Sequence, residues 1–145
     1  APSTITRLQN MGTPDYLISA ACQLVLAQRL ARRSCKDCRV PDDDVTPKVL
    51  QDLGFTAELA SRVKALKGKG CAKCKDSGYK GRQGIYEILV VSKPLKEAIL
   101  RKATTPELRE IAIKEGFQTM QDMGRRLISA GELNFREYER VLSSE

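Results

Sequence analysis

The sequence predicts a mostly α-helical protein with a small β element built around a metal site. Three observations lead to this fold class. Capping residues, prolines and glycines divide most of the chain into short helical segments. Residues 85–91 (Ile-Tyr-Glu-Ile-Leu-Val-Val) are β-branched and aromatic, as strands are. Two Cys-x-x-Cys motifs, at 35–38 and 71–74, have the arrangement of a metal-binding ribbon.

The two motifs predict a structural zinc site formed by Cys35, Cys38, Cys71 and Cys74. Each motif places two sulfurs in one tight turn, and two facing turns supply the four thiolates that suit tetrahedral zinc. Four protein ligands leave no open position, so the metal is expected to be structural rather than catalytic. Iron in the same sulfur cage, a pair of disulfides and a redox Cys-x-x-Cys remain alternatives. Cys22 is expected to be a small buried hydrophobe outside the site.

The composition limits the functional class without choosing one. The chain of 145 residues carries 25 Lys and Arg against 18 Asp and Glu, a formal net charge of +7. Such a balance suits nucleic acid, a membrane surface, nucleotide phosphates or an acidic partner. The chain has no histidine, which excludes His-based acid–base catalysis and His metal ligands. No segment resembles a signal peptide or a membrane span, and with zinc-type cysteine usage this predicts the cytoplasm.

The first part of the chain predicts two helices. Residues 4–11 have apolar residues at helical spacing, and Gly12 is a suitable stop. A second helix is predicted over about residues 14–33, with Thr13 as its N-cap and Pro14 at its first position. Because its first two-thirds is apolar almost all round, we expect it to be buried inside a larger protein, of which this chain is a fragment.

Three arginines, Arg29, Arg32 and Arg33, fall in the last turn of this predicted helix. Positive charge at a helix C-terminus is favourable through the helix dipole, and that effect alone would explain them. Their alternative role is to face phosphates or a neighbouring subunit, since the guanidinium fork matches both phosphate and carboxylate oxygens.

The rest of the chain alternates short elements with clear boundaries. Between the cysteine motifs we expect two short helices and a strand within residues 64–70. A turn is predicted at residues 78–82, before the strand at 85–91. Four helices follow. The expected helix starts after the first cysteine motif are Thr46, Thr56, Ser92, Thr105 with Pro106, Thr119 and Asn134.

Several stretches together resemble one known family. They are the run from Leu24 to Arg33 leading into the first motif, the segment from Gly70 to Glu87, the opening from Thr6 to Gly12 and the tail over residues 132–142. The segment from Gly70 reads Gly-Cys-x-x-Cys-x-x-Ser-Gly-Tyr-Lys-Gly-Arg-x-Gly-Ile-Tyr-Glu. These residues resemble the C-terminal part of the secretion ATPases, the hexameric cytoplasmic motors of type II secretion and type IV pilus assembly. The resemblance covers essentially the whole chain. Ser34 departs from it, because the family usually has an apolar residue there.

The resemblance implies a division of the chain into three parts. Residues 1–34 would be the C-terminal remnant of a RecA-like ATPase core, residues 35–84 a tetracysteine zinc module, and residues 85–145 a strand and a helical bundle. The family's phosphate loop and Mg²⁺-binding acidic segments are not in this sequence, so the chain alone is not expected to be an enzyme. ATP and Mg²⁺ are expected only in the full-length protein. The tetracysteine indicates an assembly motor rather than a pilus retraction motor, and the run before the first motif favours pilus assembly over type II secretion.

The resemblance also implies partners and a location. The expected partners are the neighbouring subunits of a homohexamer and an inner-membrane platform protein, and nucleic acid is not expected among them. The expected location is the cytoplasmic side of the inner membrane. The arginine cluster would lie near the nucleotide or an adjoining subunit. The main rival is a nucleic-acid-binding zinc ribbon, which the basic residues around the motifs favour and the scarcity of aromatic residues disfavours. A chaperone-type cysteine-rich module is a third interpretation, but it would repeat the motif several times.

Overall fold

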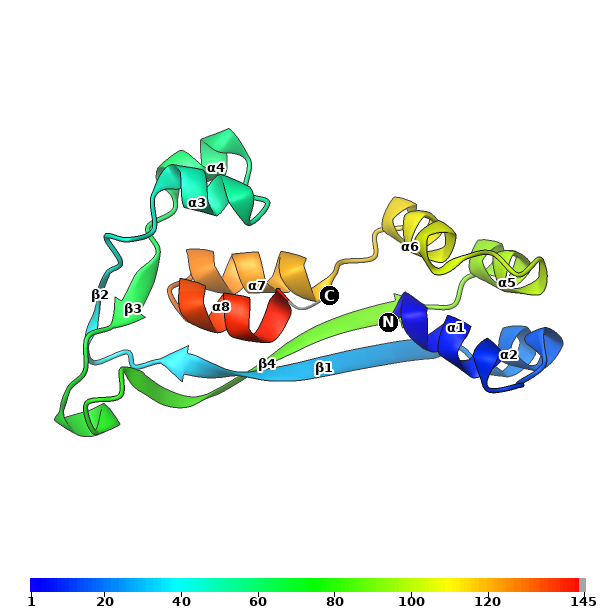
Figure 1. The fold of residues 1–145 in the computed structure, drawn as a ribbon, viewed down its shortest axis with the longest axis horizontal. Coiled ribbons are helices and arrows are strands. Elements are labelled where there is room, and N and C mark those ends of the chain that lie inside the picture. Colours follow the sequence, from blue (N-terminus) through cyan, green and yellow to red (C-terminus); the bar gives the residue numbers. More distant parts are fainter. Residues whose placement is uncertain (144–145) are drawn as a thin grey trace. The chain divides into compact units, whose positions relative to one another are not determined.

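The computed structural model describes residues 1–143, which form two compact units. Unit 1 contains residues 1–28 and 86–119, and unit 2 contains residues 29–85 and the chain from residue 120 onward. Two long strands, β1 (Leu24–Ser34) and β4 (Tyr79–Val90), pair with each other, and each contributes residues to both units (Figure 1).

The helix predicted over residues 14–33 is wrong over its second half. Helix α2 spans Asp15–Ala21, and the chain then enters strand β1. The run that follows Cys22 is rich in Leu and Ala, which favour helix locally. Pairing with a strand that is distant in sequence and rich in β-branched residues overrides that local preference. Burial and cross-strand contacts outweigh a helix propensity of about 0.5 kcal/mol per residue.

Backbone hydrogen bonds at the two ends of the pair show that β1 and β4 run antiparallel. Val91 N donates to Gln23 O (3.0 Å) at one end, and Cys35 N donates to Gly78 O (2.9 Å) at the other. The predicted strand at 85–91 is therefore present but begins earlier, at Tyr79. The predicted turn at 78–82 is wrong for the same reason, since four of its five residues lie within β4.

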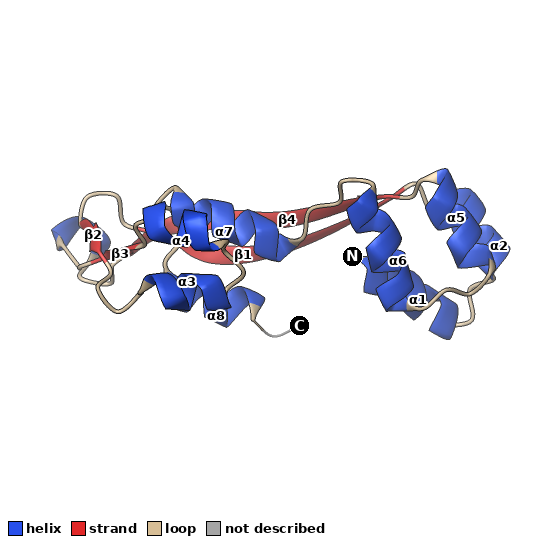
Figure 2. Ribbon diagram, turned by 90° about the horizontal axis from the view of Figure 1, so that it is seen from above, coloured by secondary structure: helices blue, strands red, loops and turns tan. Residues whose placement is uncertain are grey.

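Unit 1 is a set of helices packed on one face of its part of the sheet. Helix α2 packs on α5, α1 packs on α6, and α5 packs on α6 (Figure 2). The added elements are α1 (Pro2–Asn10), α5 (Lys93–Leu100) and α6 (Thr105–Lys114). The core is aliphatic and includes Ile5, Ile18, Val25, Leu89, Leu95, Ile99 and Leu108.

Unit 2 combines two pairs of short helices with a small two-stranded antiparallel sheet. Helix α3 packs with α4, and α7 packs with α8 (Figure 1). Strands β2 and β3 are antiparallel, with Arg39 opposite Gly68, which confirms the strand expected within residues 64–70. The elements are β2 (Arg39–Pro41), α3 (Pro47–Asp52), α4 (Ala57–Arg62), β3 (Leu66–Gly68), the 3₁₀ turn η1 (Ala72–Cys74), α7 (Met120–Ser129) and α8 (Phe135–Leu142).

Most helix starts lie where capping residues predict them. At four helices the predicted cap accepts a hydrogen bond from the backbone N–H three residues on: Thr46, Thr56, Ser92 and Asn134. Two starts differ by one residue. The N-cap of α6 is Thr104, which forms a capping box with Glu107, and α2 has Pro14 rather than Thr13 at its N-cap position.

The prediction of a mostly helical chain with a smaller β part is confirmed at this level. The β part is longer than expected because β1 and the first half of β4 belong to it. Across residues 1–143, every helix is too short or too polar to cross a bilayer.

Candidate metal centre

Two turns bring the four predicted cysteine ligands together in unit 2. Cys35 directly follows β1, and Cys38 directly precedes β2. Cys71 and Cys74 begin and end the 3₁₀ turn η1. The four sulfur atoms all lie within 4.8 Å of one another.

The spacing of the sulfur atoms fits a tetrahedral metal. The Sγ–Sγ distances are 3.8 Å for Cys35–Cys71, 3.8 Å for Cys38–Cys74 and 3.7 Å for Cys71–Cys74. Zinc–sulfur bonds of about 2.3 Å in a tetrahedron require sulfurs about 3.8 Å apart. A disulfide would need about 2.05 Å, and all five cysteines are free, so the disulfide alternative is wrong for this arrangement.

Cys22 is not part of this group. It lies half-buried at the end of α2 and packs against the aliphatic core of unit 1. Its environment is therefore that of a small apolar side chain.

Backbone N–H groups around the site donate to two of the sulfurs. Gly70 N donates to Cys38 Sγ (3.3 Å), while Cys71 N (3.2 Å) and Gly78 N (3.3 Å) donate to Cys74 Sγ. Burial raises the pKa of Cys74, but the two N–H donors, together with the thiols of Cys71 and Cys38, outweigh that effect and bring the pKa to about 6. The Gly70 N–H lowers the pKa of Cys38. Burial and the three neighbouring cysteine side chains raise that pKa by more, and the net result is a pKa of about 11. The backbone N–H donors at both sulfurs favour the thiolate, which is the form of cysteine that binds a metal.

Two glycines allow the metal loops to approach closely. A Cβ on Gly68 would lie 1.9 Å from Gly78 O, and a Cβ on Gly78 would lie 2.5 Å from Gly68 O. Gly78 also has a φ of +80°, where a side chain is strained. The backbone of Gly78 also hydrogen-bonds to both Cys35 and Cys74. The close approach of Gly68 and Gly78 therefore helps to set the distance between the two Cys-x-x-Cys turns.

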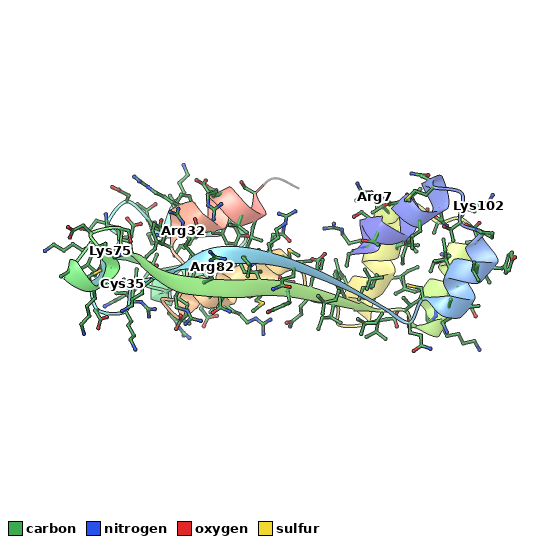
Figure 3. All side chains as sticks on the ribbon, turned by 90° about the horizontal axis from the view of Figure 1, so that it is seen from below. Arg7, Arg32, Cys35, Lys75, Arg82 and Lys102 are labelled. Carbon is green, nitrogen blue, oxygen red and sulfur yellow. The ribbon has the colours of Figure 1, made fainter. Side chains whose placement is uncertain are left out.

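Basic side chains surround the cysteine turns. Lys75 lies at the end of the lobe that carries Cys35 (Figure 3). Lys73 forms an ion pair with Asp37 across the two motifs (Nζ–Oδ1 3.7 Å). A divalent metal with four thiolates has a net charge of −2, which nearby cations offset. The exposed basic residues within or near the motifs are Lys36, Lys69, Lys73, Lys75, Lys80 and Arg82.

The three candidate arginines lie on strand β1, so their explanation as a helix C-terminal cap is wrong. Arg29 Nη1 donates to Val141 O of α8 (2.6 Å). Arg33 Nη2 donates to Gln83 Oε1 (2.8 Å), and its Nε pairs with Glu132 (3.0 Å). All three arginines thus have partners within unit 2, and the side chains of Arg32 and Arg33 are about half exposed (51% and 44%).

Arg32 belongs to a buried network centred on Glu137 of α8. The Glu137 carboxylate is fully buried, and Arg140 reaches its two oxygens at 2.7 Å each. Arg32 contributes its backbone N–H and its guanidinium (Nη2–Oε1 3.1 Å). The guanidinium also lies 4.0 Å above the Tyr79 ring, and the Tyr79 hydroxyl accepts from Asn134 Nδ2 (2.9 Å).

The network affects the acidity of Glu137. Burial raises the pKa of this carboxyl, but the hydrogen bonds from Arg140 and Arg32 outweigh it and lower that pKa to about 2. Sequence reasoning treated Asn134 and Glu137 only as a helix start, and that capping bond is present (2.8 Å). Because the partners Arg32 and Tyr79 are distant in sequence, only the fold reveals the network. It joins α8 to Tyr79, the residue directly after Gly78 at the cysteine site.

Four free cysteines with their sulfurs within 4.8 Å of one another, in a chain of short helices and two small sheets, define the class of this protein as a mixed helical and β module with a candidate metal centre. The family model for the type II/IV secretion system protein matches residues 1–140. The chain therefore belongs to the type II/IV secretion system protein family.

Named relatives agree with this family. The chain is 36% identical over 137 residues to the type IV pilus assembly ATPase PilB of Myxococcus xanthus, which covers 94% of this chain and 24% of the relative. It is 40% identical over 127 residues to PilB of Thermus thermophilus, covering 86% and 14%. It is 33% identical over 141 residues to the type II secretion system protein HxcR of Pseudomonas aeruginosa, covering 97% and 26%. The chain thus spans about a quarter or less of the length of these curated relatives.

Proposed function

We propose that this chain is the C-terminal, zinc-binding region of a hexameric ATPase that powers type IV pilus assembly or type II secretion. The observation that carries the proposal is the tetrahedral spacing of four free thiols within a member of this family. In that ATPase the chain would have a structural and coupling role rather than a catalytic one. Residues 1–34 continue a RecA-like core, residues 35–84 form the zinc module, and residues 85–145 form the strand and helical subdomain.

Cys35, Cys38, Cys71 and Cys74 would hold one Zn²⁺ per chain, which supplies folding free energy to a lobe with a small core. The helices α3 and α4 have six residues each, too short to be stable without tertiary support. The test is metal analysis with X-ray absorption, for which we expect one zinc and four sulfurs at about 2.3 Å. Nitrogen or oxygen in the first shell, or iron in place of zinc in protein purified without added metal, contradicts the assignment.

The chain alone would not hydrolyse ATP, because its sequence lacks the G-x-x-x-x-G-K-[ST] phosphate loop. ATP and Mg²⁺ would bind in the longer polypeptide, meaning this chain with the further sequence that its relatives possess. The purified chain should show no turnover and the longer polypeptide should show it. Turnover by the chain itself, surviving removal of contaminating ATPases, contradicts this proposal.

The partners would be neighbouring subunits of the homohexamer and an inner-membrane platform protein, at the cytoplasmic face of the membrane. The relatives' names, which place them in pilus assembly and type II secretion, support this. Nucleic acid is not among the proposed partners. A salt-dependent mobility shift of the zinc-loaded chain on DNA or RNA would favour the zinc-ribbon alternative instead.

Arg29, Arg32 and Arg33 remain candidates for nucleotide or subunit contacts in the assembled motor. The half-exposed side chains of Arg32 and Arg33 support this, because solvent, and therefore a further acceptor, reaches part of each. The test is to replace each arginine by Ala in the longer polypeptide and to measure zinc content, Tm and ATP turnover. A motor role lowers turnover per folded molecule by orders of magnitude.

The matched control is Glu137→Gln, which weakens the network while leaving the arginines in place. If all three Ala variants lose only stability and keep near-normal turnover, the role of these arginines is confined to their contacts within unit 2.

A further inference from the structure

The segment that begins helix α8 contacts residues beside both cysteine turns of unit 2. Beside the first turn, Ser34 N donates a hydrogen bond to Glu132 O (3.0 Å), and Cys35 is the next residue along the chain. Beside the second turn, the Tyr79 hydroxyl accepts a hydrogen bond from Asn134 Nδ2 (2.9 Å). The start of α8 is therefore held by residues that adjoin the candidate metal centre.

The backbone of Tyr79 is tied to the cysteine turns. Its N–H donates to Ser77 Oγ (3.1 Å), and the Ser77 hydroxyl donates to Cys74 O (2.7 Å). The preceding residue, Gly78, donates its N–H to Cys74 Sγ (3.3 Å) and accepts a hydrogen bond from Cys35 N (2.9 Å). The position of the Tyr79 backbone therefore depends on where two of the candidate ligands lie.

The side chain of Tyr79 supports the first turn of α8 in two ways. Asn134 is the N-cap of α8, and its Oδ1 accepts from Glu137 N (2.8 Å). Asn134 is buried, so the loss of the Tyr79 hydroxyl would remove a hydrogen bond from an amide that water scarcely reaches. The Tyr79 ring also lies 4.0 Å from the guanidinium of Arg32, which binds the buried carboxylate of Glu137 (3.1 Å). Tyr79 therefore contacts the metal centre through its backbone and α8 through its side chain.

We infer that Tyr79 is a positioning residue that couples the metal centre to α8, so that metal binding favours the docked helix and the docked helix strengthens metal binding. When a metal holds Cys35 and Cys74, Gly78 is held with them, and Tyr79 takes the position from which it supports α8. The coupling is reciprocal, because two linked equilibria change each other by the same factor. The inference rests on the proposed function, since it requires that the four cysteines bind a metal.

The test compares Tyr79→Phe with Tyr138→Phe in the longer polypeptide, and the measurement is zinc affinity in competition with a chelator. Both variants remove one tyrosine hydroxyl, but Tyr138 is a buried residue of α8 whose hydroxyl hydrogen-bonds to Arg125 of α7. Tyr79→Phe should weaken zinc binding several-fold. Tyr138→Phe should leave it nearly unchanged, because its contact does not involve the cysteine turns. Unchanged affinity in Tyr79→Phe, or equal weakening in both variants, overturns the inference.

Hydrogen exchange provides a second readout, which separates coupling from a general loss of stability. In zinc-loaded Tyr79→Phe, exchange should be faster in α8, while β2 and β3 beside the cysteines keep their protection. Equally faster exchange in α8 and in both strands would mean that the substitution loosens the whole of unit 2, and it overturns the inference. In the unsubstituted polypeptide, removal of zinc should speed exchange in α8. Unchanged exchange there overturns the inference even if Tyr79→Phe fails to fold.

Metal analysis distinguishes failure of the proposed function from failure of the inference. A longer polypeptide that binds no metal at the four cysteines contradicts both. One zinc per chain, with an α8 that does not respond to its removal, contradicts the coupling alone. ATP turnover is not a readout here, so failure of the ATPase assignment leaves this test intact.

Discussion

Ser34 is a buried polar residue with no compensating side-chain contact. It is fully buried, and its hydroxyl has no hydrogen-bond partner among the described residues. The backbone at this position is paired, since Ser34 N donates to Glu132 O (3.0 Å). An apolar side chain at this position would avoid the cost of an unpaired hydroxyl. The structure therefore gives a physical reason to expect that Ser34 lowers the stability of the chain.

We expect Ser34→Ala to raise the free energy of unfolding of the zinc-loaded chain by about 1 kcal/mol, since an unsatisfied buried group costs about 1–3 kcal/mol. Denaturant unfolding measures it. The control is Ser77→Ala, which should destabilise, because the Ser77 hydroxyl donates to Cys74 O (2.7 Å) and accepts from Tyr79 N (3.1 Å). A loss of stability in Ser34→Ala would show that its hydroxyl is satisfied.

Glu137 makes the stability of unit 2 depend on pH. Its folded pKa of about 2 lies below the ordinary value of 4.5. A lowered carboxyl pKa contributes stability that is fully present above the unfolded pKa and is lost as the pH falls through the folded one. The contribution should therefore decline from about pH 4.5 toward about pH 2.

The measurement is the difference in unfolding free energy between the protein and Glu137→Gln, followed downward from neutral pH. Comparing the two proteins removes the effect of acid on the cysteine site, which both share. We expect the difference to be largest near neutral pH and to shrink in acid. A difference that stays constant across this range contradicts the assignment to Glu137.

At the scale of single elements, α7 and α8 form a close pair that depends on a glycine. A Cβ on Gly124 of α7 would lie 2.4 Å from Leu142 Cδ1 and 2.7 Å from Tyr138 Cε2, both on α8. Glycine ordinarily weakens a helix by about 1 kcal/mol relative to alanine, so its presence here indicates a packing requirement.

Gly124→Ala should lower the free energy of unfolding, because overpacking costs about 1–3 kcal/mol and exceeds the gain in helix propensity. Thermal unfolding with intact zinc content checks the prediction. Ser129→Ala, at an exposed position of the same helix, exchanges one exposed hydrogen bond to Arg125 O (3.1 Å) for a higher helix propensity and should be nearly neutral. An increase in Tm for Gly124→Ala would mean that α7 and α8 separate readily.

At the scale of the whole molecule, metal removal should act unevenly on the two units. All four candidate ligands belong to unit 2, whereas unit 1 has its own aliphatic core. After chelation we expect faster hydrogen exchange in the cysteine lobe, with residues 93–114 of unit 1 little changed.

Substitutions provide the matched comparison for metal removal. Cys71→Ser should reproduce the effect of the chelator, while Cys22→Ala should keep one zinc per chain. Equal loss of protection in both units would show that the metal stabilises the whole chain rather than its own lobe.

The sequence by itself determined the features whose causes are local. The caps at Thr46, Thr56, Ser92 and Asn134, the strand after Gly84 and the four clustered cysteines were all predictable. Each of these depends on neighbouring residues or on a ligand spacing that chemistry restricts. The small errors at Thr104 and Pro14 have the same origin, because adjacent residues can both satisfy a cap.

Only the tertiary structure decided that residues 24–34 form a strand, and therefore which partners Arg29, Arg32 and Arg33 have. The composition of residues 24–34 favours a helix locally, but these residues pair with β4. No local sequence pattern predicts that pairing. The Glu137 network follows from the same pairing, and so does the alternation of buried and exposed residues along the two strands. Contacts between residues far apart in sequence determine both, because burial on a sheet outweighs the weak conformational preferences of individual residues.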